Sequence, residues 1–324
     1  MLISVIICTY ARAESLELLL QCLLAQRTTN FEVIVVDGSG DNPSVRDAVA
    51  SFQVHHAGAI NVCLIQSSKG LTHQRNVGLR YAQGELICFL DDDVTFERDF
   101  LADVLALFDR SDFADVGGLT AYDILNYGSK VSMRWRVRRT LGVIPSLEPG
   151  SIDRLGRATP LTFLKPFSGV KTIGHFSGFC MIYRRSAIAN LRFDEQLPTY
   201  GGEDRDFSSL VGRNSRLVIC GDLRIRHHRA PQSRDHDVDR TYQDGFGTGR
   251  TYAKHCTWTD YPLLLGVSVG EILVSLLAFV SNPSRNRWLF IFARPAGVLA
   301  GIRSYKSCED SRPEYKAAST GFRD

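Results

Sequence analysis

The sequence lacks the features of a secreted, disulfide-stabilised or zinc-stabilised protein. None of its eight cysteines stands at C-x-x-C spacing, and no Asn-x-Ser/Thr sequon with an allowed middle residue occurs. Most of the cysteines lie in apolar runs, as Cys88 does between Ile87 and Phe89, which is typical of buried, reduced thiols. Met1 is followed directly by apolar residues rather than by a basic segment and a cleavage site. We therefore expect a reducing, cytosolic compartment.

A strong charge of either sign is also missing, as are internal repeats and low-complexity tracts. The 38 Lys and Arg residues exceed the 35 Asp and Glu residues by only three, so nucleic-acid binding is not expected. The positive charge is concentrated in residues 124–171, which contain nine basic and two acidic residues. Its densest part, residues 134–139, predicts either a solvated helix face or a contact with anionic groups.

The N-terminal third alternates short apolar runs with segments of helical periodicity. The expected strands are Val5–Cys8, Glu32–Val36, Val62–Ile65 and Leu86–Leu90. The expected helices are residues 16–26 with Ser15 as N-cap, residues 70–83 ending at Gly84, and residues 97–109. Apolar strands connected by helices predict an α/β fold with a doubly wound, mostly parallel sheet. In such sheets, ligands bind beyond the carboxyl ends of the strands.

Beyond residue 140 the pattern is less regular. Residues 141–169 contain four prolines and little periodicity, which indicates a long irregular excursion of the kind that is usually functional or mobile. Strands are expected again at residues 172–183 and 216–226. After about residue 232 a polar stretch leads into two apolar segments, Leu263–Val280 and Trp288–Ile302.

Three consecutive carboxylates, Asp91, Asp92 and Asp93, follow the fourth apolar run. Strand alternation directs Asp91 and Asp93 to one side and Asp92 to the other. Two carboxylates two residues apart form a hard-cation site that keeps coordination positions free for phosphate oxygens. A solvated acidic turn is the alternative, but carboxylates at the end of a buried strand are costly without a compensating positive charge. The pattern therefore favours a metal site.

Two further polar motifs are ambiguous by themselves. Two glycines precede Glu203 and Asp204 at the start of an expected helix, where acidic residues are ordinary capping chemistry. The pair His227 and His228 follows an expected strand, where the odds between a structural role and a ligand role are about even. Their meaning depends on the other motifs in the chain.

The order of these segments, from Leu2 to about Arg229, resembles that of the family 2 glycosyltransferases, which are inverting enzymes of GT-A fold. The matching segments are Thr9-Tyr10-Ala11-Arg12, Asp37-Gly38-Ser39-Gly40-Asp41, Arg75-Asn76-Val77-Gly78, Phe89-Leu90-Asp91-Asp92-Asp93, Gly202-Glu203-Asp204 and His227. Each segment alone is weakly specific. Their order along most of the chain is specific, and it implies the GT-A form of the α/β fold.

The resemblance implies a role for each matched residue. Asp91, Asp93 and His227, with His228 as the alternative to His227, would hold a divalent metal, either Mn²⁺ or Mg²⁺. The donor nucleotide sugar would contact Thr9, Tyr10, Arg12, Asp37, Arg75, Asp91 and Asp92. Asp204 would act as the general base on the acceptor hydroxyl, and Glu203 would orient that hydroxyl.

One position departs from the family pattern. Many members carry two acidic residues before Gly-Ser, whereas here Val36 precedes the single Asp37. If Asp37 corresponds to the base-reading acid, recognition of uracil or thymine is retained. If it corresponds to the second acid, that contact is in doubt.

The implied function is metal-dependent, inverting transfer of a sugar from a UDP- or dTDP-sugar to a hydroxyl of a glycan or a lipid-linked acceptor, in the synthesis of envelope or surface polysaccharide. A nucleotidyltransferase is one alternative, but it would need a glycine-rich phosphate loop, which Tyr10-Ala11-Arg12-Ala13 does not provide. A non-catalytic protein that binds sugar nucleotides is another. It would not need the metal carboxylates, the Glu-Asp pair and the histidine together.

The same resemblance divides the chain into a catalytic domain at residues 1–231 and a C-terminal helical region at residues 232–324. Within the catalytic domain, residues 1–123 would bind the donor and residues 124–231 would face the acceptor. On that acceptor side, the basic residues 134–139 would contact acceptor phosphates or the membrane surface.

The segment Leu263–Val280 raises the question of membrane attachment. As a helix it is apolar except for a stripe formed by Ser268, Glu271 and Ser275. Its length is short for a span, and a central Glu is costly in lipid. A helical pair packed on the catalytic domain is the alternative to attachment. We expect peripheral attachment to the cytosolic face of the inner or plasma membrane, where headgroups would meet Arg285, Arg287, Arg303 and Lys306.

Overall fold

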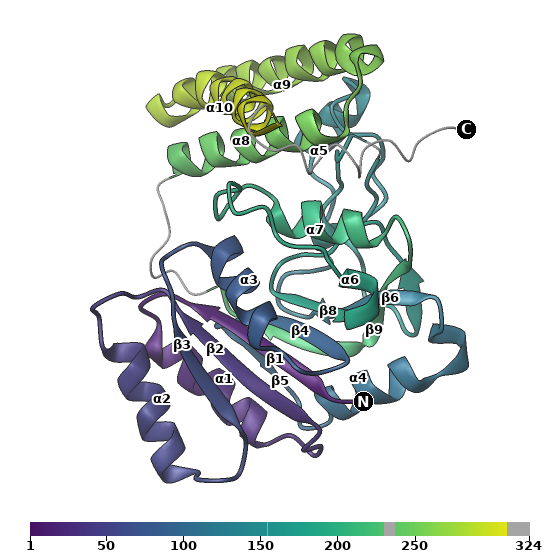
Figure 1. Ribbon diagram of the computed structural model, residues 1–324. Helices are drawn as coiled ribbons and strands as arrows, with labels where there is room; N and C mark the ends of the chain where they lie inside the picture. The colour runs from purple at the N-terminus through teal and green to yellow at the C-terminus, as the bar shows by residue number, and fades with distance from the viewer. Residues whose placement is uncertain (154, 230–236, 310–324) are drawn as a thin grey trace.

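The computed structural model describes residues 1–153, 155–229 and 237–309 (Figure 1). The strands are β1 (Ile3–Thr9), β2 (Phe31–Asp37), β3 (Val62–Gln66), β4 (Leu86–Asp91), β5 (Val94–Phe96), β6 (Val116–Asp123), β7 (Val170–Thr172), β8 (Cys180–Arg184) and β9 (Arg216–His227). The helices are α1 (Ala13–Leu24), α2 (Ser44–His55), α3 (Leu71–Tyr81), α4 (Phe100–Asp109), α5 (Met133–Thr140), α6 (Arg185–Ile188), α7 (Glu203–Val211), α8 (Asp237–His255), α9 (Tyr261–Ser281) and α10 (Arg285–Glu309).

Within the described residues, the strands form one sheet in the order β3-β2-β1-β4-β8-β6-β9-β5, and β7 also pairs with β9. Strands β1 to β4 are parallel, and β6 and β9 run in the same direction as these four. Strands β5, β7 and β8 run antiparallel to their neighbours. The first four expected strands are all present, and the predicted α/β fold with a mostly parallel sheet is confirmed.

Helices cover both faces of this sheet. On one face, the buried leucines of α1 pack with α2, α4 and strand side chains such as Val5 and Cys88. On the other face, α3, α6 and α7 pack against side chains such as Phe89 and Tyr183. Figure 1 shows α3 in front of the sheet, with the helices α8, α9 and α10 gathered beyond one end of it. Because β1, β2 and β4 are buried on both faces, their sequences are mainly apolar without alternation.

The predicted start of the first helix is wrong. Helix α1 begins at Ala13, so Ser15 lies inside its first turn, and Arg12 occupies the N-cap position without a side-chain cap. The guanidinium of Arg12 instead donates a hydrogen bond to Asp92, which lies 80 residues further along the chain. This long-range ion pair has no local sequence signal, which explains why a capping rule missed it.

The predicted role of Gly84 as a helix C-terminal glycine is also wrong. Helix α3 ends at Tyr81 and is followed by Ala82 in an extended conformation. Gly84 is required for a different reason. A β-carbon at position 84 would lie 2.6 Å from both the carbonyl oxygen of Leu2 and the amide nitrogen of Ser4, so only glycine allows this approach to β1.

The expected strand at residues 172–183 is split into β7 and β8, and residues 173–179 between them form a loop that reaches the carboxyl ends of the parallel strands. The described residues of 141–169 are mainly irregular as predicted, apart from a 3₁₀ turn at Leu161–Phe163 and an isolated antiparallel bridge between Ile152 and Ala158. The buried cysteines Cys88, Cys180 and Cys220 are free thiols, as expected, whereas Cys63 is exposed. The side chain of Cys308 lies outside the described residues.

The polar stretch after residue 232 contains a helix, α8, which lies in the region expected to be helical but whose bounds were not predicted. Its glycines explain both the omission and the packing. A β-carbon at Gly249 would collide with the carbonyl of Val298 in α10, and one at Gly301 of α10 would collide with the carbonyl of Phe246. Small residues four apart on both helices thus let two backbones approach closely. Glycine disfavours an isolated helix, so local propensity is misleading here.

The two apolar segments form α9 and α10. Pro262–Ser281 is long and apolar enough to cross a membrane, and only 22% of its most apolar window is buried. Glu271 points inward and is bound by Arg138 of α5, whereas Leu265, Leu277 and Val280 are exposed. The predicted polar stripe therefore faces the protein, and the apolar side of α9 faces outward.

Candidate active site

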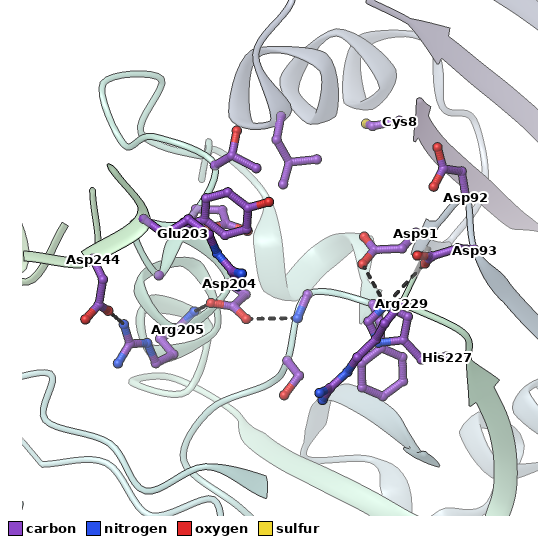
Figure 2. A pocket seen from close by; sticks show the side chains of 18 of the residues that line it. Cys8, Asp91, Asp92, Asp93, Glu203, Asp204, Arg205, His227, Arg229 and Asp244 are labelled. Carbon is purple, nitrogen blue, oxygen red and sulfur yellow. Dashed lines mark hydrogen bonds and ion pairs between the residues drawn. The ribbon is translucent and has the colours of Figure 1, made fainter. Parts of the chain in front are cut away.

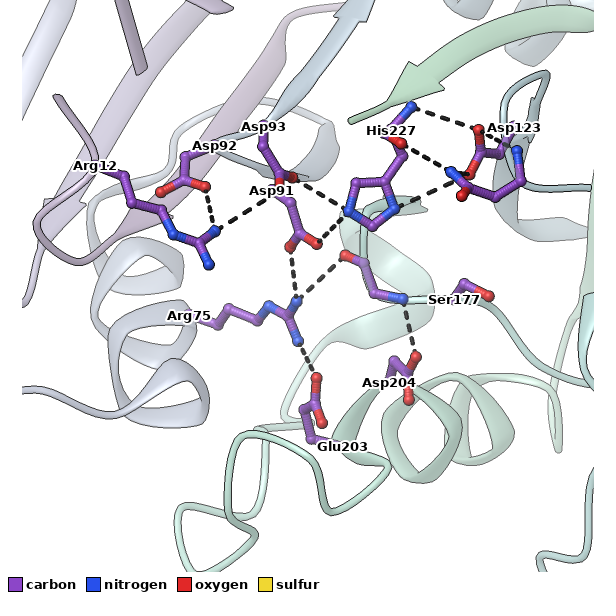
Figure 3. Close-up of polar contacts among 12 residues, drawn as sticks. Arg12, Arg75, Asp91, Asp92, Asp93, Asp123, Ser177, Glu203, Asp204 and His227 are labelled. Atoms are coloured by element: carbon purple, nitrogen blue, oxygen red, sulfur yellow. Dashed lines mark hydrogen bonds and ion pairs between the residues drawn. The ribbon is translucent and has the colours of Figure 1, made fainter. Parts of the chain in front are cut away.

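Functional side chains gather where the parallel strands end. Thr9 ends β1, Asp91 ends β4, Asp123 ends β6 and His227 ends β9. Because these four strands run in one direction, their carboxyl ends meet at one edge of the sheet, as Figure 3 shows. A cavity of about 960 Å³ opens there, between this edge, α7 and the C-terminal helices.

Asp91, Asp93 and His227 form a cluster with the chemistry of a divalent metal site. Nε2 of His227 lies 3.2 Å from Oδ1 of Asp93 and 3.8 Å from Oδ2 of Asp91. One ligand atom from each residue lies within 4.8 Å of the others. Two carboxylates and one imidazole suit Mn²⁺ and Mg²⁺, so the residues fit the predicted ion.

The structure separates the two candidate histidines. His227 faces the carboxylates, and its ring stacks on Phe179 with 5.2 Å between centroids. His228 is exposed, and its Nε2 lies 2.8 Å from Oγ1 of Thr95. Burial lowers the pKa of His227, but the hydrogen bond with Asp93 and the charge of Asp91 outweigh this effect, and the net pKa is raised.

Asp92 points to the opposite side of the strand end, as alternation predicts. Thr9 Oγ1 donates a hydrogen bond of 2.7 Å to one carboxylate oxygen of Asp92, and Arg12 Nη1 donates one of 3.0 Å to the other. Burial raises the pKa of Asp92 to about 6, although Arg12 and Thr9 both act to lower it. Asp92 thus fixes two predicted donor-site residues against each other.

Arg75 links the metal cluster to the Glu-Asp motif. Its Nη2 lies 3.5 Å from Oδ1 of Asp91, and its Nη1 donates a hydrogen bond of 3.1 Å to Oε1 of Glu203. Figure 3 shows this guanidinium between the two carboxylates. Burial, followed by the nearby charge of Asp204, raises the pKa of Glu203 to about 7 even though Arg75 acts to lower it.

Asp204 is held by two backbone amides. The N–H of Gly178 donates to Oδ2 at 2.9 Å, and the N–H of Arg205 donates to Oδ1 at 2.7 Å. The side chain is half-buried and lines the cavity, opposite the metal cluster in Figure 2. A carboxylate oriented by two donors, with one side open to a cavity, is placed to accept a proton from a bound hydroxyl.

Asp37 is the predicted site residue that is absent from the described lining of this cavity. It is fully buried at the end of β2, where Oδ1 accepts a hydrogen bond of 2.9 Å from Ser39 N and Oδ2 accepts one of 3.0 Å from Gln66 Nε2. Ser39 Oγ in turn accepts a hydrogen bond from the amide of Ala11. Asp37 therefore supports the turn beside Tyr10, and Tyr10 itself lines the cavity.

Sequence reasoning missed Asp123. Its Oδ2 lies 4.0 Å from Nδ1 of His227, on the side of the ring opposite the metal cluster. Asn126 donates hydrogen bonds both to Oδ2 of Asp123 and to the carbonyl of His227. A carboxylate behind a ligating histidine orients the ring. The sequence signal that could have found Asp123 is an acidic residue at the carboxyl end of a buried strand, the same signal that identified Asp91.

The sequence also missed the contribution of the C-terminal helices. Arg240 and Asp244 of α8, Ser275 of α9 and Arg294 of α10 line the same cavity. Conversely, Arg138, predicted to contact anions, is bound to Glu271 by two hydrogen bonds of 2.8 and 2.6 Å. The expectation that all the arginines of 134–139 are available to a ligand is therefore corrected for Arg138, and of the others only Arg134 is in the described lining of this cavity, from which Arg136 and Arg139 are absent.

The chain matches known proteins over more than half of its length. The profile of the family described as "Glycosyl transferase family 2" matches residues 4–192. The amylovoran biosynthesis glycosyltransferase AmsB of Erwinia amylovora is 34% identical over 107 residues, which cover 33% of this chain and 36% of that protein. Chondroitin synthase of Escherichia coli is 26% identical over 258 residues, covering 74% of this chain and 36% of that one. The chain thus spans about a third of the length of these curated relatives.

Solved structures share the fold. The mannosyltransferase PcManGT from Pyrobaculum calidifontis, in complex with GDP-Man and Mn²⁺, aligns with a TM-score of 0.55 at 15% identity, covering 97% of this chain and 87% of the other. TarS residues 1–349 of S. aureus align with a TM-score of 0.50 at 18% identity, covering 96% and 92%. At such low identity the likeness establishes the GT-A fold alone.

Proposed function

Because the chain belongs to glycosyltransferase family 2, as the match over residues 4–192 shows, we propose that it transfers a sugar from a nucleotide-sugar donor to an acceptor hydroxyl with inversion at the anomeric carbon. One observation carries the proposal. The cluster of Asp91, Asp93 and His227 and the carboxylate of Asp204 line one cavity and face each other across it (Figure 2).

The donor is proposed to lie along the carboxyl ends of β1 and β4. Thr9, Tyr10, Arg12, Arg75, Asp91 and Asp92 are the proposed donor contacts, with Asp37 acting through the Ser39 turn. Arg12 and Lys69 line this side of the cavity, and Nζ of Lys69 lies 4.3 Å from the centroid of the Tyr10 ring. Two cations and an exposed aromatic ring suit the diphosphate and the base of a UDP- or dTDP-sugar.

Asp91, Asp93 and His227 would hold Mn²⁺ or Mg²⁺. When bound, such an ion neutralises the charge that develops on a leaving diphosphate. Asp123, through His227, would keep the imidazole in the ligating orientation. Arg75 adds fixed positive charge between this site and Glu203.

On the acceptor side, Asp204 is proposed to take the proton of the attacking hydroxyl. The oxygen of that hydroxyl bonds to the anomeric carbon as the bond to the diphosphate breaks, so a single displacement inverts the configuration. Glu203 is buried beside Asp204 and orients the acceptor. Its pKa of about 7 means that it is partly protonated near neutral pH, so it can also donate a hydrogen bond.

The boundary between the proposed domains, 231/232, lies outside the described residues. We propose residues 1–231 as the catalytic domain, with residues 1–123 binding the donor and 124–231 facing the acceptor, and residues 232–324 as a helical region. Ion pairs between the two regions support their packing against each other. Lys254 of α8 lies 2.8 Å from Asp206 of α7 and 2.8 Å from Asp194.

The outward apolar side of α9 and α10 supports the proposed peripheral attachment to the cytosolic face of the inner or plasma membrane. Its exposed side chains include Leu265, Val269, Leu277, Val280, Trp288 and Phe292. Of the basic residues expected at the headgroups, Arg285, Arg303 and Lys306 are exposed, whereas Arg287 caps α9 by donating to the carbonyl of Ala278. A lipid-linked or glycan acceptor in envelope or surface polysaccharide synthesis fits this placement.

A thermal-shift panel of UDP-, dTDP- and GDP-sugars, each with and without Mn²⁺, tests the proposed donor and metal. We expect stabilisation by a UDP- or dTDP-sugar only when Mn²⁺ is present. Release of nucleoside diphosphate from the stabilising donor distinguishes the candidate activities. A nucleotidyltransferase would transfer the nucleoside monophosphate group and release the sugar 1-phosphate instead, and a non-catalytic binder would release nothing.

A further inference from the structure

A second cavity of about 430 Å³ adjoins the 960 Å³ cavity that contains the proposed donor site, and it lies on the proposed acceptor side. It lies between α5, the irregular segment after α5, and the helices α8, α9 and α10. Ser177, Asp204 and Arg205 line both cavities. The proposed general base therefore stands at the junction, with the donor on one side and the second cavity on the other.

The walls of the second cavity carry an excess of positive charge. Of its five arginines, Arg157 is paired with Asp153 at 2.7 Å. The other four are Arg134 and Arg138 of α5, Arg205 of α7 and Arg294 of α10, and the acids that contact them are Asp244 and Glu271. The four guanidinium groups exceed these two carboxylates by two charges. Asp204, when ionised, lowers the excess to one.

The arginines differ in how closely their guanidinium groups are paired with carboxylates of the protein. Arg138 is taken up by Glu271, with contacts of 2.8 and 2.6 Å. Arg205 reaches Asp244 only at 3.5 Å. Arg134 makes no hydrogen bond or ion pair with any other residue that the structure describes, although it lines both cavities. Two of the cations are thus available to a further anion.

The arginines are also close enough to repel one another. Arg294 is half-buried beside Asp244 and Glu271, and this burial lowers its pKa to about 9, with further lowering by Arg138, Arg205 and Arg134. Like charges gathered in a partly buried wall are costly unless an anion offsets them. A ligand that supplies negative charge here would stabilise the arrangement.

We propose that the second cavity binds a phosphate group of the acceptor through Arg134 and Arg205, with Arg294 adding positive charge to the same wall, and thereby places a neighbouring hydroxyl beside Asp204. This inference rests on the proposed transferase function. A phosphate ester carries one or two negative charges and three terminal oxygens, which suits a net excess of one or two positive charges presented by arginines from three different helices. A carboxylate supplies one charge and two oxygens, and matches less well.

The phosphate can belong to a soluble phosphate ester or to a lipid. The outer side of α9 is apolar, while Glu271 on its inner side lines the cavity. A lipid chain could therefore run along α9 with its phosphate in the cavity. The shared chemistry is the phosphate ester, and the two sources differ in whether an acyl chain adds affinity.

The test uses the full-length protein with its donor site filled by UDP and Mg²⁺. Binding of glycerol 3-phosphate and of an eight-carbon lysophosphatidic acid is measured by calorimetry, with the matching monoacylglycerol as the control without phosphate. The variants are Arg134→Gln and, as a matched control on the same helix, Arg139→Gln, whose exposed side chain lies outside the described lining of both cavities.

We expect Arg134→Gln to weaken phosphate-ester binding by about tenfold or more, the effect of losing one charged hydrogen bond, and Arg139→Gln to leave it unchanged. Tighter binding of the acylated ester would assign the phosphate to a lipid, and equal binding to a soluble ester. Absence of phosphate-ester binding in the wild type, or equal loss in both variants, would overturn the inference.

Donor hydrolysis in the same samples tests the transferase function separately. If hydrolysis is intact in every variant while the ester fails to bind, only the second-cavity proposal fails.

Discussion

Nη1 of Arg75 in α3 donates a hydrogen bond of 3.1 Å to Oε1 of Glu203 at the start of α7, and both side chains are buried. The same guanidinium lies 3.5 Å from Asp91 at the end of β4. One cation therefore fixes the spacing between the proposed metal site and the proposed acceptor site. This contact crosses 128 residues of sequence, and it explains why two acidic motifs far apart in the chain act at one cavity.

Arg75→Met should destabilise the protein by about 3–5 kcal/mol, because it leaves the buried Glu203 and the half-buried Asp91 without their shared cation. Urea unfolding of the variant and the wild type measures this difference. Arg80→Met on the same helix is the control, since Arg80 is exposed, and it should change the free energy of unfolding by less than about 0.5 kcal/mol. Equal effects of the two substitutions would argue against the bridging role of Arg75.

Stability should depend on pH through Glu203. Burial, followed by the charge of Asp204, raises its pKa from 4.5 to about 7 in the folded state, so the folded protein binds this proton more tightly than the unfolded chain. The contribution to stability is complete below the unfolded pKa and is lost as the pH rises toward 7. Unfolding of the wild type and Glu203→Gln, compared between about pH 4.5 and 7.5, should show the wild type losing stability relative to the variant. Parallel curves would show that Glu203 titrates normally.

Asp123→Asn should weaken Mn²⁺ binding by about 10- to 100-fold, because the carboxylate behind His227 orients the ligating ring. Titration of Mn²⁺ followed by electron paramagnetic resonance measures the affinity. Asp239→Asn on the exposed surface of α8 is the matched charge control. An unchanged affinity in Asp123→Asn would place His227 outside the metal site or make its orientation independent of Asp123.

The packing of α8 on α10 should depend on glycine. Gly249→Ala should destabilise the protein by about 1–3 kcal/mol, because the added methyl group would collide with the carbonyl of Val298. Gly266→Ala in α9 is the opposite case. No atom lies within 4 Å of a β-carbon there, so the substitution should stabilise the helix by about 0.5–1 kcal/mol. Thermal unfolding of both variants tests the pair, and a loss of stability in Gly266→Ala would contradict this account.

The parallel strands and the two sides of the Asp motif could be predicted from the sequence, because both follow from local periodicity. Val5–Cys8 and Leu86–Leu90 are apolar without alternation, and Asp91 and Asp93 share one face because strand side chains alternate. The fate of Arg12 could not be predicted in this way. A helix-capping rule considers neighbouring residues only, whereas Arg12 is bound by Asp92, 80 residues away.

The C-terminal part of the site was missed for a related reason. The glycines of α8 disfavour a helix locally, and only the backbone of α10 beside them makes the helix stable. Likewise, Arg138 was expected at an anionic ligand, and Glu271 was considered only as a costly residue in lipid. The two side chains instead form an ion pair across 133 residues of sequence. Pairings of this range depend on the tertiary fold, which single-sequence patterns do not specify.

The most direct test of the central claim is turnover of the donor by Asp204→Asn. The substitution keeps the shape of the side chain and removes the base, so binding of the nucleotide sugar and of Mn²⁺ should match the wild type while turnover falls by about 10²-fold or more. Both quantities are measured on the same protein, by calorimetry and by release of nucleoside diphosphate. Turnover within about threefold of the wild type, with binding unchanged, would contradict the assignment of Asp204 as the general base.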